Sequence, residues 1–153
     1  MNDMNITADT KIATDYIKRL RKEGAKAYQN RTESTPTAGI FKKSYEPWVA
    51  DGGLEKAGHI SYFEETDMAY KCRVDSYRMA QYAPNVAVNN YAPLPEPDEY
   101  GIYPYVYNMD SEIGMLIRDT DNKVYECYAN PITAMIWSPS QLPASFRLIE
   151  EGF

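Results

Sequence analysis

The clearest periodicity along the chain lies near its start, where apolar residues return every three or four positions. Between Thr7 and Glu23 they form one stripe, which consists of Ile12, Ala13, Tyr16, Ile17 and Leu20. This spacing places them on one face of an amphipathic α-helix. Basic residues crowd the last turns, where the helix dipole favours cations, and Gly24 offers a left-handed stop.

Further along, from Ile40 onward, the pattern changes to the strict alternation that is typical of β-strands. The expected strands are 59–63, 68–74 and 90–91, and then 115–118, 123–127 and 146–149. Acidic turns at 64–67 and 119–122 separate the first two strands of each set. In the strand 68–74, alternation puts Met68, Tyr70, Cys72 and Val74 on one face. We therefore predict a mainly β fold, in which an N-terminal amphipathic helix precedes two small tandem three-stranded β modules.

Two segments without apolar periodicity divide the chain. The segment 30–39 is polar and reads as a linker, and the segment 92–99 carries three closely spaced prolines, which favours a stiff, extended connector. The expected organisation is a helix with its linker over 1–39, a first β module over 40–95 and a second over 96–153.

The two β segments share a register. Tyr70-Lys71-Cys72 matches Tyr125-Glu126-Cys127, and the same offset places Tyr82-Ala83-Pro84 on Trp137-Ser138-Pro139 and Tyr91 on Phe146. Gly58 and Gly114 correspond if a single-residue insertion lies between them. Several classes of position in one register indicate an internal duplication.

The composition argues against several classes of function. The 153 residues are 44% hydrophobic and carry a net charge of -6, so a phosphate-binding surface is a poor expectation. No apolar run is long enough to span a membrane, and the opening Met1-Asn2-Asp3-Met4-Asn5 lacks the features of a signal peptide. Two cysteines and one histidine leave too few ligands for a zinc site, and nothing suggests a cofactor.

Individual residues with chemical potential have structural explanations of their own. We expect both cysteines to be buried in their own halves and His59 to be an ordinary strand residue. The carboxylates Glu64-Glu65 and Asp119 with Asp121 lie in predicted turns, where acidic residues are favoured for backbone reasons, so we do not expect catalysis there.

Aromatic residues are the more open question, because 14 of the aromatic side chains are tyrosines, which cover apolar area and still tolerate water. Tyr82 and Trp137 precede a proline in both halves, which favours a packing corner over a ligand stack. Tyr100, Tyr103, Tyr105 and Tyr107 form an expected ladder on one strand face, which is either core or contact surface.

A glycine-led hairpin, Tyr-x-Cys, an aromatic-x-Pro corner and a closing aromatic together resemble the small chitin-binding type-3 domains, also called carbohydrate-binding modules of families five and twelve. The segment 137–149, Trp-Ser-Pro-Ser-Gln-Leu-Pro-Ala-Ser-Phe-Arg-Leu-Ile, looks most like the divergent copies found in bacteriophage tail and virion proteins. The resemblance covers 45–95 weakly and 101–150 more firmly, and it leaves the N-terminal segment before Ile40 unexplained.

The chain departs from this family where sugar-binding members carry adjacent exposed aromatics. The corresponding residues are Arg73-Val74-Asp75 and Tyr128-Ala129-Asn130, so only Tyr128 remains as a stacking ring. The glycan-contacting residues that the resemblance implies are Trp48, Tyr105 and Tyr128.

The resemblance leads us to expect a non-enzymatic structural or attachment protein of a bacteriophage particle, made in the bacterial cytoplasm. Ile12, Tyr16, Ile17 and Leu20 would dock it to other virion proteins or to a second copy of itself. The open alternative is that this stripe packs back on the β modules. The alternative is a genuine glycan-binding module that recognises bacterial surface polysaccharide through exposed tyrosines. Neither expectation includes nucleic acid, a metal or insertion into a membrane.

Overall fold

The computed structural model describes residues 37–150, in which short strands and single 3₁₀ turns predominate. The mainly β character expected from the sequence is therefore confirmed. The predicted helix, with Ile12, Tyr16, Ile17 and Leu20, lies outside the described residues.

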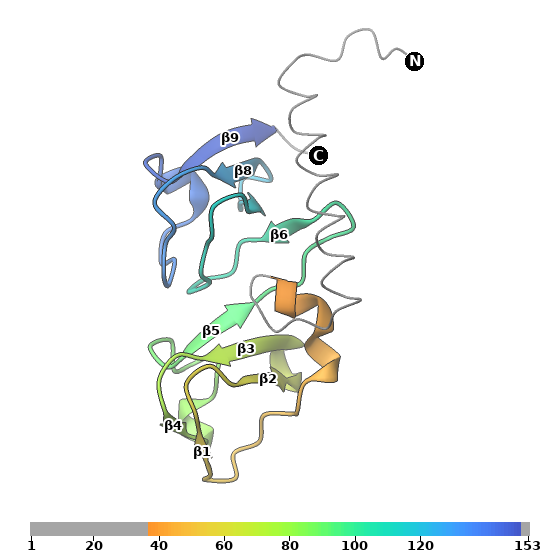
Figure 1. Cartoon of the computed structure of the whole chain (residues 1–153), viewed down its shortest axis with the longest axis vertical. Helices are drawn as coiled ribbons and strands as arrows, with labels where there is room; N and C mark the ends of the chain where they lie inside the picture. The colour runs from red at the N-terminus through yellow and green to blue at the C-terminus, as the bar shows by residue number, and fades with distance from the viewer. Residues whose placement is uncertain (1–36, 151–153) are drawn as a thin grey trace, which may run out of the picture.

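The first half of the structure, residues 37–95, contains two small sheets (Figure 1). Its elements are η2 (Thr37–Ser44), β1 (Leu54–Glu55), β2 (Ile60–Phe63), η3 (Glu64–Thr66), β3 (Met68–Cys72), β4 (Ser76–Tyr77), η4 (Ala80–Tyr82) and β5 (Tyr91–Leu94). The order β2-β3-β5 forms an antiparallel three-stranded sheet, and β1 pairs with β4 in a separate two-stranded ribbon.

The second half, residues 96–150, contains one four-stranded sheet in the order β6-β7-β8-β9. Its elements are β6 (Ile102–Pro104), β7 (Leu116–Arg118), β8 (Val124–Cys127), η5 (Pro139–Gln141) and β9 (Phe146–Glu150). The expectation of three strands was wrong here, because β6 adds a parallel partner to β7. The described part of the first half has a single parallel bridge at the corresponding place, between Pro47 and Tyr62.

Equivalent backbone hydrogen bonds occur in both halves. Val86 donates to the carbonyl of Ala83, and at the matching positions of the second half Gln141 donates to that of Ser138. Tyr91 and Phe146 donate in the same way to the carbonyls of Ala87 and Leu142. The turn residues match too, since Asp67 and Asn122 both have positive φ, as do Gly58 and Gly114.

Each half, as far as the structure describes it, has two apolar clusters, and the larger of the two contains one cysteine. Cys72 packs with Trp48, Phe63, Tyr70 and Tyr91, and Cys127 with Tyr103, Met109, Met115, Ile117, Met135 and Phe146. Both thiols are free, and each points to the backbone carbonyl of the next residue but one, Val74 or Ala129. Burial raises the pKa of both thiols, so they are protonated packing groups, as the sequence predicted. The predicted alternation does not extend to Val74, which lies beyond the end of β3 and has an exposed side chain.

Both predicted linkers proved to be partly structured. Thr37–Gly39 belong to η2, where Gly39 lies so close to the chain after β5 that a Cβ would come within 2.6 Å of the Leu94 carbonyl oxygen. Residues 92–94 of the expected connector form most of β5 and are buried. Pro93 is tolerated there because β5 is an edge strand, which among the described strands pairs only with β3.

The tyrosine ladder expected over 100–107 is also absent from the described structure, because β6 ends at Pro104. Tyr103 is buried in the core, Tyr105 is half-buried, and Tyr100 and Tyr107 are exposed. The four rings therefore have different environments and do not share one face.

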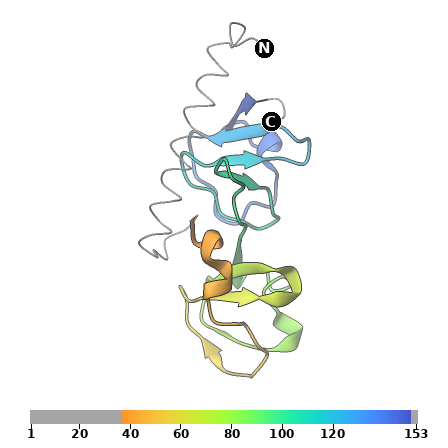
Figure 2. The same ribbon diagram turned by 90° about the vertical axis from the view of Figure 1, so that its right-hand side faces the viewer.

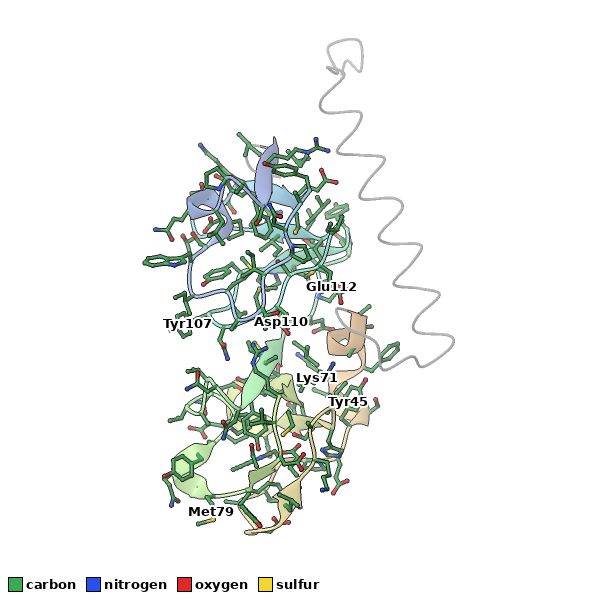
Figure 3. All side chains as sticks on the ribbon, turned by 60° about the vertical axis from the view of Figure 1, so that its left-hand side comes forward. Tyr45, Lys71, Met79, Tyr107, Asp110 and Glu112 are labelled. Carbon is green, nitrogen blue, oxygen red and sulfur yellow. The ribbon has the colours of Figure 1, made fainter. Side chains whose placement is uncertain are left out.

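The two halves meet at a seam whose hydrogen bonds involve Arg73, Asn108 and Asp110. The Arg73 guanidinium donates to a carboxylate oxygen of Asp110 at 2.8 Å and to the backbone carbonyl of Asn108 at 2.7 Å. In return, the Asn108 amide nitrogen donates to the carbonyls of Val88 and Tyr91. Figure 3 shows Asp110 at the edge of the second half that faces the first. The seam thus consists of directional contacts that fix one orientation.

We predict that Asn108 contributes to stability both through its side chain and through its backbone. Asn108→Gly removes the side-chain hydrogen bonds to Val88, Tyr91 and Arg73, which are buried or part-buried, and lowers the free energy of unfolding by about 1–3 kcal/mol. Because Asn108 has φ +77°, Asn108→Ala adds a further penalty of about 1 kcal/mol for a left-handed alanine. Chemical denaturation of the full chain measures both, and equal stability of the two variants would contradict the backbone contribution.

Candidate ligand-binding groove

An open groove with a volume of about 550 Å³ lies on the first half. The residues that line it are Gly52, Val74, Asp75, Ser76, Tyr77, Met79, Tyr82 and Asn90. Tyr77 is 64% exposed and Tyr82 is 55% exposed, so two large rings contribute to the groove while facing solvent. Figure 3 places Met79 at the end of the first half that is remote from the seam.

Strand alternation explains why Tyr77 faces outward. The β1–β4 ribbon pairs Leu54 with Tyr77 and Glu55 with Ser76. Successive side chains of a strand point to opposite faces, so the Leu54–Tyr77 pair is exposed and the Glu55–Ser76 pair is buried.

The inward side of this ribbon is held by a carboxylate. The Glu55 side chain has no exposed surface, and its two oxygens receive hydrogen bonds from the Tyr91 hydroxyl at 2.7 Å and from the Ser61 hydroxyl at 3.4 Å. The His59 Nδ1 lies 2.7 Å from the same carboxylate. Tyr91 in turn accepts a hydrogen bond from the Trp48 indole at 3.1 Å. A buried carboxyl group needs such partners, so the network ties β1 firmly to the three-stranded sheet.

Two further carboxylates fasten the outer edges of the ribbon. Asp51 receives hydrogen bonds from the Arg78 guanidinium and the Gly53 amide, both at 2.9 Å, and these bonds lower the pKa of Asp51. Asp75 accepts the Ala57 amide at 2.9 Å and pairs with Lys56 at 3.4 Å. Asp75 is half-exposed on the groove, so it retains acceptor capacity for a ligand.

The second ring of the groove, that of Tyr82, belongs to the aromatic-x-Pro corner of the first half. Pro84 and Pro139 are both fully buried, whereas the preceding rings of Tyr82 and Trp137 are each 55% exposed. The packing corner predicted from the sequence is therefore formed by the prolines, and the prediction that the aromatic rings pack there was wrong.

The three ring residues implied by the family resemblance do not come together. Trp48 is 7% exposed and contacts Phe63 edge-to-face with ring centroids 5.5 Å apart, so it belongs to the core and offers no face to a ligand. Tyr105 is half-buried and donates its hydroxyl to the Met135 carbonyl at 2.8 Å.

Tyr128 is 41% exposed, but its surroundings are already occupied. Its hydroxyl donates to the Pro143 carbonyl at 2.8 Å, and the Arg147 guanidinium lies 5.7 Å from its ring centre. In the register of the repeat, Tyr128 corresponds to Arg73 and Pro143 corresponds to Val88, whose carbonyl accepts the Asn108 amide at the seam. In the second half, Tyr128 thus satisfies a carbonyl whose counterpart in the first half accepts the Asn108 amide across the seam.

Asp119 and Asp121 have structural partners, and Asp119 is buried, although acidic residues in turns are usually solvated. Asp119 accepts the Ser140 amide at 2.8 Å and the Thr120 hydroxyl at 3.1 Å, and Asp121 accepts the Tyr125 hydroxyl at 2.8 Å. Burial raises the pKa of Asp119, but the hydrogen bonds from Ser140 and Thr120 outweigh it and lower the pKa overall. Within residues 37–150, no group of three or more potential metal ligands is present.

Comparison with known proteins adds no assignment: the sequence matches no family model and no curated protein. In the part of the chain that the structure describes, no helix has the length and apolar character needed to cross a membrane. The groove must therefore be interpreted from its own chemistry.

We predict that the Tyr91 hydroxyl is essential for the Glu55 network. Tyr91→Phe leaves a buried carboxylate oxygen and the Trp48 indole without their partner, so the free energy of unfolding falls by about 3 kcal/mol. The matched control Tyr82→Phe removes an exposed hydroxyl and changes it by less than about 0.5 kcal/mol. Denaturant titration compares the two, and similar values would contradict the role given to Tyr91.

The contribution of Asp119 to stability should depend on pH. Its folded pKa lies below the ordinary value of 3.8, so its stabilising effect is fully present above that value and disappears as pH falls through the folded pKa. Wild type should therefore exceed Asp119→Asn in stability at pH 7, and the difference should shrink below about pH 4. Thermal unfolding between pH 3 and pH 7 measures it, and a constant difference would contradict this prediction.

Proposed function

We propose that this protein is a non-enzymatic carbohydrate-binding attachment protein, and that the groove of the first half is a sugar-binding site. The observation that carries the proposal is the presence of two exposed tyrosines, Tyr77 and Tyr82, along one open groove. Large rings that are exposed together along one groove are typical of a contact surface, and tyrosine is well suited to contacts that are half apolar.

The polar residues of the groove fit the edges of a sugar. A pyranose has apolar C–H faces, which stack on aromatic rings, and a rim of hydroxyls, which donate and accept hydrogen bonds. Asp75 and Asn90 supply polar atoms beside the rings. Among the described residues, neither arginine nor lysine lines the groove, so the matching ligand is an uncharged sugar rather than a phosphorylated or strongly acidic one.

The wider context of the proposal comes from the sequence. The shared register and the equivalent hydrogen bonds support two tandem copies of one small β module. The likeness of the segment 137–149 to modules of bacteriophage tail and virion proteins supports a role in attaching a virion to a polysaccharide-covered cell. The N-terminal stripe would then join this protein to other virion proteins or to a second copy.

The same groove does not suggest an enzyme. Glycoside hydrolysis requires two carboxyl groups that flank the scissile bond. Within the described part of the chain, Asp75 is the only acidic residue that lines the groove, and the Glu55 carboxylate behind the ribbon is buried and already hydrogen-bonded.

We predict that the purified full chain cosediments with at least one insoluble polysaccharide among chitin, cellulose and bacterial cell-wall preparations. Tyr77→Ala and Tyr82→Ala should each weaken binding roughly tenfold, which corresponds to the loss of about 1.4 kcal/mol of ring contact.

The control is Tyr100→Ala, which removes an equally large, exposed ring in the turn before β6 and should leave binding unchanged. The proposed function would be contradicted if wild type cosediments with none of the three materials. Equal loss in Tyr100→Ala and Tyr82→Ala would contradict the assignment of the groove.

A further inference from the structure

We propose that Trp137 is a second sugar-stacking residue, so that one extended polysaccharide chain contacts both halves of the protein. This inference rests on the proposed function of the groove and adds a site that lies outside it. Its ligand is an uncharged polysaccharide that is long enough to pass from the groove to the second half.

The first observation is that Trp137 has the backbone setting of Tyr82, a ring that lines the groove. In both cases one residue separates the ring from a fully buried proline, and each ring is 55% exposed. The turn that follows is closed in both halves by the same backbone bonds, from Val86 to Ala83 and from Gln141 to Ser138. Two equivalent turns, one in each half, thus expose an aromatic ring to solvent.

The second observation is that Trp137 belongs to an exposed apolar patch, which we define as Tyr107, Ile136 and Trp137. Tyr107 is 54% exposed and Ile136 is 53% exposed. Their segments lie side by side, because the Asn108 amide donates to the Met135 carbonyl and the Met135 amide donates to that of Met109. Clustered apolar side chains that remain exposed mark binding surfaces more often than single ones do.

The third observation is that the ring stands on an ordered turn. Ser138 and Gln141 form a capping box at the start of η5, and the Asp119 carboxylate accepts the Ser140 amide. A ring carried by a segment fixed in this way loses little conformational freedom when it binds.

The arrangement of the halves allows one chain to reach both rings. Figures 1 and 2 show η4 and η5 on the same side of the molecule, since both lie at the left in the first view and at the right in the second. Figure 3 places Tyr107 at the edge of the second half that faces the first, beside the seam. The Arg73 hydrogen bonds hold the halves in one orientation, so the spacing of the two sites is constant.

Two sites on one rigid body make affinity depend on the length of the ligand. A trisaccharide that fills the groove gains nothing from Trp137. A polymer that reaches Trp137 binds its second site at a high effective concentration and is held more tightly without any change in the groove.

The experiment compares binding of the full chain to a trisaccharide and to a soluble polymer of the same sugar. The probes are chitotriose with glycol chitin, and cellotriose with hydroxyethylcellulose, and calorimetry measures both affinities. Trp137→Ala should weaken binding of the polymer at least tenfold and leave binding of the trisaccharide unchanged. Tyr82→Ala should weaken both, and Trp137→Phe, which keeps a ring, should recover most of the affinity for the polymer.

The outcomes distinguish a failure of this inference from a failure of the proposed function. If wild type binds neither trisaccharide nor polymer of either sugar, this inference fails, and the proposed function fails with it if the bacterial cell-wall preparation is not bound either. If wild type binds and Trp137→Ala has the same affinity for the polymer, or loses trisaccharide and polymer binding equally, only the second site is overturned. Because Trp137 is exposed, the variant should unfold at the same denaturant concentration as wild type, which verifies that it is folded.

Discussion

A fully buried carboxylate organises the first half of this protein. Glu55 comes from a strand of only two residues, which could not persist by its own pairing with β4. Its carboxylate collects hydrogen bonds from the three-stranded sheet, and these determine which face of the ribbon is turned inward. The outward face then has to present Tyr77, so an electrostatic requirement of the interior decides what the surface offers to a ligand.

The two halves use one backbone design with different side chains at the same positions. In the first half, Arg73 reaches across the seam to Asn108 and Asp110. In the second half, the corresponding position is Tyr128, which turns back to the Pro143 carbonyl of its own half. The position that carries a sugar platform in the family that the sequence resembles thus joins the halves in one copy and forms a hydrogen bond within its own half in the other. The rings that stay exposed are those of the proline corners.

The strands were predictable because apolar and polar residues alternate along each half over a stretch long enough to show a period of two. The turns were predictable because Asp67 and Asn122 tolerate the left-handed conformation. The cysteines were predictable from their general preference for burial. Tyr77 was not, because β4 is too short to show alternation. Trp48 was misassigned, since only the contact of its segment with β2 brings the ring into the core. Neither Glu55 nor the parallel pairing of β6 leaves a local pattern, because both depend on residues distant in sequence.

Backbone amide shifts of the full chain in solution, followed by NMR during titration with chitotriose, cellotriose and a hydrolysed cell-wall polysaccharide, test the location of the sugar site most directly. A binding sugar should shift the amides of residues 74–79 and Tyr82 and leave those around Trp48 and Tyr91 in the core unchanged. Binding that shifts other surfaces and spares the groove, or no shift with any of the three sugars at saturating concentration, would contradict the assignment of the groove.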